Sequence, residues 1–275
     1  MLCWFAILFV PLTFIKGQKM NNKLVSIITP AYNAEQYIDE TLNSVLASSY
    51  NNIEVVVVDD GSTDSTVTIV EQHAARDPRV RLIRQSNAGA CRARNNAIEN
   101  ARGYYILPVD ADDLIMPWLV EELVRLIESK PGVKVVMPRG EFFGARSGPW
   151  KLPAFSLKLL ARRNMICATA LYRREEWERV GGYDEEIIAL EDWAFWTAVL
   201  KDGGDVLTTE RVGLRYRIHA GSKRIRDRKY KHHVIDTLNK RHPEFYQRVL
   251  GGPLRYHRTW SRLINRFTRA PHKWL

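Results

Sequence analysis

Cysteine is scarce in this 275-residue chain, and no two cysteines form a Cys-x-x-Cys pair. Cys3, Cys91 and Cys167 are odd in number and far apart, which argues against a disulfide framework and against a zinc site. This usage predicts a reducing, cytoplasmic location. The sequence has no internal repeat and no low-complexity segment. Its 45% hydrophobic and 26% charged residues are typical of folded globular proteins rather than disordered or membrane-embedded ones.

The N-terminal apolar run is uncharged but too short to span a membrane. As a helix, Met1–Ile15 would reach about 22 Å, whereas a bilayer core is about 30 Å thick. No Lys or Arg precedes the run and no clear small-residue cleavage site follows it, so it is also a poor secretory signal. We therefore expect Met20 to be the natural start and residues 1–19 to be an upstream extension. A short membrane anchor is the alternative.

Positive charge is concentrated at the C-terminus. Of the net charge of +10, Gly221–Leu275 contributes 15 basic and 3 acidic residues, a balance of +12. The preceding 220 residues have 26 basic and 28 acidic residues, a balance of −2. Residues 223–275 also show helical patterns, so we expect a basic helical tail after the main domain.

Short β-branched runs alternate with helical patterns in the first half of the chain. This alternation predicts an α/β, Rossmann-like fold in which helices flank a mainly parallel sheet. The expected strands are Leu24–Thr29, Ile53–Val58, Val80–Arg84, Tyr104–Val109 and Val133–Met137, with one or two more within Val206–Ile218. The expected helices are Ala34–Ser48, 64–76, Gly89–Asn100, Trp118–Ser129, Glu175–Val180 and Asp192–Lys201. Asn33 and Gln36 predict a capping box for the first helix, and Pro117 is expected to start the fourth.

Polar, turn-forming or acidic residues follow four successive expected strands. They are Thr29–Asn33, Asp59–Ser62, Asn87–Gly89 and Asp110–Asp113. Ligands of parallel sheets bind outside the carboxyl ends of the strands, because the crossover connections diverge there. We therefore expect these four segments to line one pocket.

Carboxylates dominate this expected pocket and indicate its ligand. Asp59, Asp60, Asp110, Asp112 and Asp113 would repel one another unless a cation or hydrogen-bond donors accompany them. Carboxylate oxygens suit Mg²⁺ or Mn²⁺, and such ions commonly bridge to phosphate oxygens. The cluster therefore predicts a divalent metal and a phosphate ester. A single aspartate here, such as Asp113, could instead be a cap or turn residue.

Six segments of the chain, in order, resemble family 2 of the glycosyltransferases, whose members have the GT-A fold. They are Val25–Asn33 (VSIITPAYN), Val55–Asp64 (VVVVDDGSTD), Asn87–Asn95 (NAGACRARN), Ile106–Asp113 (ILPVDADD), Gly181–Glu185 (GGYDE) and Glu191–Trp193 (EDW). The resemblance implies inverting transfer of one sugar from a nucleotide-diphosphate donor to an acceptor hydroxyl. It favours a UDP-sugar as donor, Mn²⁺ or Mg²⁺ as cofactor, and a role in cell-surface polysaccharide, lipopolysaccharide or glycoconjugate synthesis.

The resemblance also implies roles for individual residues. The expected nucleotide contacts are Pro30, Tyr32, Asn33, Asp59, Asp60, Gly89, Arg94 and Asp110; the expected metal contacts are Asp112, Asp110 and His219; and Asp192, with Glu191, is expected to be catalytic. Asp112 would bind the metal directly, while Asp110 would contact the ribose or a metal-bound water. Asp192 would be the general base that deprotonates the acceptor hydroxyl. A domain at 20–222 would contain a nucleotide-binding half, 20–115, and an acceptor half, 116–222.

Each of these assignments has a simpler structural alternative. Asp192 could only cap its helix, and His219 could be a hydrogen-bonded structural residue. Arg94 could contact the diphosphate or pair with neighbours on its own helix. The aromatic residues that follow Asp192 (Trp193, Phe195 and Trp196) could shape an acceptor wall, but core packing is the favoured interpretation.

Other classes of function make different demands on the sequence. A sugar-nucleotide nucleotidyltransferase usually has a glycine-rich basic loop after its first strand, whereas this chain has Pro30–Asn33. A non-catalytic nucleotide-sugar-binding protein would be expected to lose Asp112 or Asp192, and both are present. A processive synthase would be expected to have a Gln-x-x-Arg-Trp motif and membrane spans. The sequence shows neither, which argues for transfer of one sugar at a time.

The C-terminal segment allows two further interpretations. Its aromatic and basic residues could indicate nucleic-acid binding. Residues 253–269, however, place Tyr256, Trp260, Ile264 and Phe267 at helical spacing, with arginines on the rest of the surface. This pattern favours an amphipathic helix on an anionic membrane, where a glycan or lipid-linked acceptor would lie, so we expect peripheral association at the cytoplasmic face and no nucleic-acid partner. A solvated basic face is the alternative.

Overall fold

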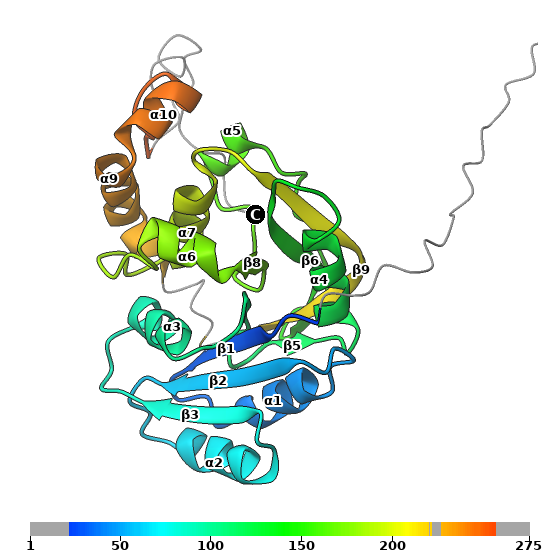
Figure 1. The fold of residues 1–275 in the computed structure, drawn as a ribbon. Helices are drawn as coiled ribbons and strands as arrows, with labels where there is room; N and C mark the ends of the chain where they lie inside the picture. The colour runs from blue at the N-terminus through cyan, green and yellow to red at the C-terminus, as the bar shows by residue number, and fades with distance from the viewer. Residues whose placement is uncertain (1–21, 220, 222–226, 257–275) are drawn as a thin grey trace, which may run out of the picture.

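The computed structural model describes residues 22–219, 221 and 227–256 (Figure 1). The predictions about residues 1–19 and about a natural start at Met20 concern a segment outside the described residues. Within these residues, nine strands form one sheet in the order β3-β2-β1-β4-β8-β6-β9-β5, with β7 paired to β6. The predicted α/β fold with a mainly parallel first half is confirmed.

The first half alternates strands and helices as predicted. The strands β1 (Val25–Ala31), β2 (Ile53–Asp59), β3 (Val80–Arg84) and β4 (Tyr105–Pro108) pair in parallel. The crossover helices are α1 (Ile38–Leu46), α2 (Thr66–Arg76) and α3 (Ala90–Glu99). Every residue of β2 is buried, which explains its continuous apolar run, because helices cover both faces of such a sheet. Its last residue, Asp59, pairs with Ala31 and Arg84, so three strand ends share one edge.

The second half of the sheet is mixed and strongly curled (Figure 1). Its strands are β5 (Leu114–Ile115), β6 (Val133–Gly144), β7 (Gly148–Trp150), β8 (Leu171–Arg173) and β9 (Asp205–Ile218). The helices are α4 (Leu119–Ile127), α5 (Leu157–Leu160), α6 (Arg174–Val180) and α7 (Glu191–Leu200). The predicted strand Val133–Met137 is longer than expected: β6 continues to Gly144, and the chain then turns into β7. Phe142 stacks on Trp150 and meets Tyr216 edge-on, and these cross-strand aromatic contacts favour the strand pairing.

Two predicted helix starts are wrong. Asn33 does not cap α1, which begins at Ile38; it has a φ of 50° and its side-chain oxygen accepts a hydrogen bond from the Thr63 N–H at 2.8 Å. Pro117 precedes α4, and its carbonyl accepts a hydrogen bond from the Ser49 N–H at 2.8 Å. In both cases a contact with a segment distant in sequence replaces the local capping pattern.

The C-terminal helices pack onto the domain rather than extending from it. They are the 3-10 helix η1 (Asp227–Tyr230), α9 (Lys231–Arg241) and α10 (Pro243–Leu250). In Figure 1, α9 lies beside α7, and α10 lies above it next to α5. Their buried residues, including Leu238, Phe245 and Tyr246, belong to the same hydrophobic core as the sheet. Arg241 also pairs with Asp184 at 2.7 Å.

Little of the predicted amphipathic helix at 253–269 lies within the described residues. Residues 253–256 are not helical, and the remainder lies outside them. None of the helices in the described part of the chain is both long enough and apolar enough to span a bilayer.

Candidate active site

The Asp60 carboxylate anchors the loop that leads into α3. It accepts hydrogen bonds from the N–H groups of Ala88 at 2.8 Å and Gly89 at 2.9 Å, and from the Gln85 side chain at 2.8 Å. Gly89 has a φ of 89°, a left-handed conformation that glycine adopts without the strain imposed by a Cβ atom. The structure thus places two of the predicted nucleotide contacts, Asp60 and Gly89, in direct contact with each other.

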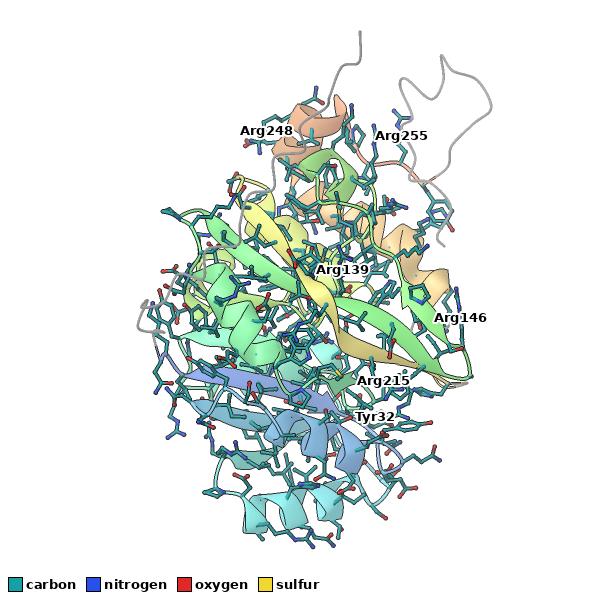
Figure 2. All side chains as sticks on the ribbon, turned by 90° about the vertical axis from the view of Figure 1, so that its right-hand side faces the viewer. Tyr32, Arg139, Arg146, Arg215, Arg248 and Arg255 are labelled. Carbon is teal, nitrogen blue, oxygen red and sulfur yellow. The ribbon has the colours of Figure 1, made fainter. Side chains whose placement is uncertain are left out.

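Asp59 presents an unsatisfied oxygen beside this loop. Its Oδ2 atom accepts a hydrogen bond from the Ser62 N–H at 3.2 Å, whereas its buried Oδ1 atom has no partner among the described residues. A buried carboxylate oxygen without a donor is costly, so a ligand N–H or O–H at this position would be stabilising. Tyr32, at the end of β1, is 52% exposed, and Figure 2 shows it below Arg215 on the face turned to the viewer.

A buried arginine connects the acidic loop after β4 with the start of α7. The Arg94 guanidinium donates to Asp110 Oδ1 at 2.7 Å and to Glu191 Oε1 at 2.6 Å. Burial disfavours its charge, but Asp110 and Glu191 outweigh this effect and raise the pKa of Arg94 well above its usual value. Pairing with helix neighbours, one alternative for Arg94, is wrong: its two terminal nitrogens bind carboxylates from two other elements.

Asp112 pairs with His219 at the end of β9. Its Oδ2 atom lies 2.9 Å from His219 Nε2, although 107 residues separate the two in sequence. The His219 ring also packs on Tyr37 at 4.9 Å between centroids. Burial and the neighbouring Asp110 raise the pKa of Asp112, as expected for carboxylates crowded at one strand end. The structure therefore brings together two of the three predicted metal contacts.

The residues of this pair suit a divalent ion with two protein ligands. A carboxylate oxygen and an imidazole nitrogen would together hold such an ion in place of the hydrogen bond that joins them. Asp110, however, turns one oxygen to Arg94, and within the described part of the chain no group of three or more His, Cys, Asp or Glu side chains could hold a metal. The predicted three-residue metal set is therefore not assembled. Mg²⁺-type sites often use one or two carboxylates and complete their shell with water and substrate phosphates.

Asp113 is buried and hydrogen-bonded to the backbone of β9. It is 1% exposed, and its Oδ1 atom accepts a hydrogen bond from the Arg217 N–H at 2.9 Å. Arg217 in turn donates from Nε to the backbone oxygen of Asp112 at 2.8 Å. Burial, followed by the charges of Asp112 and Asp110, raises the pKa of Asp113 well above its ordinary value. Asp113 and Arg217 thus join the acidic loop to β9, the strand that leads to His219.

Asp192 lies in the first turn of α7 and does not cap it. The helix begins at Glu191 after Leu190, and Asp192 Oδ1 accepts a hydrogen bond from the adjacent Trp193 N–H at 2.8 Å. Its other oxygen accepts from the Asn164 side chain at 2.6 Å. Burial and the adjacent Glu191 raise the pKa of Asp192 to about 6, against the opposing effects of Arg94 and these hydrogen bonds. A carboxylate with this pKa is suited to accept a proton near neutral pH.

The aromatic residues after Asp192 form part of the hydrophobic core, which was the favoured interpretation of the sequence. Trp193, Phe195 and Trp196 are all at most 2% exposed. Sequence patterns did not identify Asn164, which lies in an irregular segment without a recognisable motif. Arg217 was within reach of prediction, since it lies two residues before His219.

The comparisons with known proteins agree with this geometry. The family model of glycosyl transferase family 2 matches residues 26–185, so the chain belongs to this family. The UDP-Glc:alpha-D-GlcNAc-diphosphoundecaprenol beta-1,3-glucosyltransferase WfaP of Escherichia coli is 32% identical over 209 residues, which cover 73% of this chain and 79% of the relative. Matches to three other curated relatives cover only 30% to 38% of their lengths.

Solved structures show the same architecture. TarS of S. aureus, residues 1–349, in complex with UDP-GlcNAc has a TM-score of 0.62 and 26% identity, and the match covers 72% of this chain and 60% of that one. The mannosyltransferase PcManGT of Pyrobaculum calidifontis in complex with GDP-Man and Mn²⁺ has a TM-score of 0.63 and 21% identity, with 82% and 68% covered. The GT-A fold expected from the sequence is thereby confirmed.

Proposed function

We propose that the protein is an inverting, metal-dependent glycosyltransferase that transfers one sugar from a nucleotide-diphosphate donor to an acceptor hydroxyl. The observation that carries this proposal is the buried bridge Asp110–Arg94–Glu191. Because Glu191 is followed directly by Asp192, the bridge holds a carboxylate with a pKa of about 6 next to the strand end that carries the acidic loop. A donor site and a base are thereby fixed relative to each other.

The nucleotide would lie over the carboxyl ends of β1, β2 and β3. The unsatisfied Asp59 Oδ1 atom would accept a hydrogen bond from the base, and exposed Tyr32 would contact it from the end of β1. Gly89, held by Asp60, would allow the diphosphate to approach the start of α3. This arrangement supports the division into a nucleotide-binding half at 20–115 and an acceptor half at 116–222. The donor bound in TarS suggests a UDP-sugar.

Asp112 and His219 would hold the divalent ion. When bound, the ion neutralises the negative charge that builds up on the leaving diphosphate. Mn²⁺ in the mannosyltransferase complex supports this choice of cofactor. Arg217 and Asp113 would keep the acidic loop and His219 in register, because their hydrogen bonds join these two segments.

Asp192 would remove the proton from the acceptor hydroxyl. As that oxygen bonds to the anomeric carbon, the bond between this carbon and the diphosphate oxygen breaks, so a single displacement inverts the configuration. Asn164 orients the Asp192 carboxylate through its hydrogen bond at 2.6 Å. A well-positioned general base contributes a factor of about 10² to 10⁴ in rate.

The acceptor would be a glycan or a lipid-linked sugar in cell-surface polysaccharide, lipopolysaccharide or glycoconjugate synthesis. This proposal follows the name of the Escherichia coli relative, whose acceptor is a diphosphoundecaprenol-linked sugar. Peripheral membrane association through the basic C-terminus fits such an acceptor. Flotation with anionic liposomes tests it: binding that is unchanged after deletion of residues 253–275 would contradict a role for this segment.

A donor screen that measures metal-dependent release of nucleoside diphosphate tests the main proposal. We expect release with at least one UDP- or GDP-sugar, and a loss of orders of magnitude in Asp112→Ala and Asp192→Asn. Activity that both substitutions leave intact would refute the site. Formation of a nucleotide sugar with release of pyrophosphate would instead identify a nucleotidyltransferase. Binding of a nucleotide sugar without turnover would identify a non-catalytic binding protein.

A further inference from the structure

Asn95 on α3 binds the segment between α6 and α7, mainly through the backbone of Tyr183. Its Oδ1 atom accepts hydrogen bonds from the Tyr183 N–H at 2.8 Å and from Trp177 Nε1 at 3.1 Å. Its Nδ2 atom donates to the Tyr183 carbonyl at 2.9 Å and to Glu185 at 3.1 Å. Asn95 is 6% exposed, so these bonds are shielded from water. One buried side chain thus binds both backbone groups of Tyr183, which restricts its position and its orientation.

Tyr183 passes this restraint to the helix that carries the candidate base. Its ring stacks on Phe195 with 4.2 Å between centroids and an angle of 16° between the planes. Phe195 lies three residues after Asp192, so both residues share one face of α7. Tyr183 and Phe195 are 3% and 2% exposed, and interiors packed this closely transmit small shifts instead of absorbing them.

The helix α3, which carries Asn95, begins in the proposed donor site. The N–H of Gly89, immediately before α3, binds Asp60, while Asn96 donates to Gln85 at 2.7 Å and Gln85 donates to Asp60. The helix α3 therefore contacts the donor side at its start and, through Asn95, the α6–α7 segment further along. The position of α3 therefore sets the distance between the donor side and the α6–α7 segment.

We propose that Asn95 is a positioning residue for sugar transfer: by holding Tyr183 against Phe195, it fixes α7 so that Asp192 faces the acceptor hydroxyl. The inference rests on the proposed function and adds a residue that touches neither substrate nor metal. A purely structural role would change the stability of the fold alone. A positioning role changes kcat while binding of the nucleotide stays the same, because the hydrogen bonds of Asn95 run to Trp177, Tyr183 and Glu185 and not to a proposed donor contact.

Two neighbouring glycines provide a matched pair of variants. Gly181 and Gly182 have φ values of 78° and 84°, so an alanine imposes similar backbone strain at either position. A Cβ atom at Gly182 would lie 2.8 Å from Asn95 Oδ1 and 3.1 Å from Trp177 Nε1, whereas at Gly181 nothing lies within 4 Å. Gly182→Ala therefore disturbs the Asn95 contact, and Gly181→Ala controls for the strain.

The experiment measures kcat and the donor KM with the donor found in the screen, and binding of UDP and GDP with Mn²⁺ by calorimetry. We expect Gly182→Ala to lower kcat about tenfold to a hundredfold, the size of effect that a displacement of about 1 Å produces. We expect Gly181→Ala to retain the native kcat, and both variants to bind the nucleoside diphosphate as the native protein does. Equal kcat values in the two variants would overturn the inference, as would a Gly182→Ala defect confined to nucleotide binding.

A second pair covers the case in which Gly182→Ala does not fold. Asn95→Asp keeps the acceptor oxygen but removes both donors to Tyr183 and Glu185, and exposed Asn100 at the end of α3 gives the control Asn100→Asp. A lower kcat in Asn95→Asp alone, with native nucleotide binding, supports the inference; equal kcat values contradict it. If the native protein neither binds a nucleoside diphosphate nor transfers sugar, the proposed function fails and the inference falls with it.

Discussion

Replacing Asp192 by asparagine should abolish transfer and at the same time stabilise the folded protein. The pKa of Asp192 is raised from an ordinary value of 3.8 to about 6, chiefly by burial and by Glu191. At about 1.4 kcal/mol per unit, this shift of roughly two units amounts to about 3 kcal/mol by which the folded state disfavours the ionised carboxylate at neutral pH. The neutral amide of asparagine removes this penalty.

The hydrogen bonds around Asp192 reduce the gain. Asparagine can still accept from the Trp193 N–H, but its amide nitrogen would then face the amide nitrogen of Asn164. Asn164 must turn its side chain, which gives up its bond from the Ile166 N–H at 3.3 Å and costs about 1 kcal/mol. We therefore expect Asp192→Asn to raise the free energy of unfolding by about 1 to 2 kcal/mol at pH 8.

The stabilisation should depend on pH in one direction. Below pH 3.8 the aspartate is protonated in both states, so the native protein carries no penalty. Between pH 3.8 and about 6 the unfolded state ionises while the folded state retains its proton, so the stability of the native protein falls as pH rises. Above about pH 6 the penalty is constant. Asp192→Asn lacks this fall, so its advantage should be small at pH 4.5 and complete at pH 8.

Urea unfolding of the native protein, Asp192→Asn and Asp202→Asn at both pH values tests this prediction. Asp202 is exposed just after α7, and its substitution should change stability by less than about 0.5 kcal/mol without affecting transfer. Transfer by Asp192→Asn should fall by a factor of about 10² to 10⁴. A variant that is less stable than the native protein at pH 8, or that retains its activity, would refute the reasoning.

Three further predictions concern the metal pair, the arginine bridge and pH. Asp112→Asn and His219→Ala should each raise the Mn²⁺ concentration needed for half-maximal transfer by about 10-fold or more, as expected when one of two protein ligands is lost; titration curves that coincide with the native curve would exclude this pair as the metal site. Arg94→Met should lower the free energy of unfolding by about 3 to 5 kcal/mol, because it removes the buried cation that pairs with buried Glu191 and partly buried Asp110; urea unfolding within 1 kcal/mol of native, on the order of measurement error, would contradict this bridge. The native kcat should fall about tenfold per pH unit below about pH 6, since Asp192 must be ionised to act as a base; a kcat independent of pH between 4.5 and 7 would argue against this role.

Local patterns in the sequence were sufficient to predict the strands of the first half of the sheet. The strand Val80–Arg84 has the predicted bounds, and Ile53–Asp59 differs by one residue. Both are short β-branched runs between helical segments, and their burial depends mainly on hydrophobicity, which each residue carries with it. The convergence of Asp59 and Asp60 with Gly89 at one edge also follows from the parallel order of the strands.

Contacts between distant segments were not predictable in this way. Arg94 meets Glu191 across 97 residues, and Asp112 meets His219 across 107, because the packing of helices and the curl of β9 bring them together. Contacts between distant segments also explain why Asn33, a predicted helix cap, instead binds Thr63. Pairing with β7 likewise accompanies the extension of the predicted strand Val133–Met137 to Gly144. Residue type and spacing thus specified which chemistry the chain carries. Only tertiary packing decided which carboxylates pair with other side chains and which keep an oxygen without a protein partner, as Asp59 does among the described residues, because that choice depends on the partners that folding places within hydrogen-bond distance.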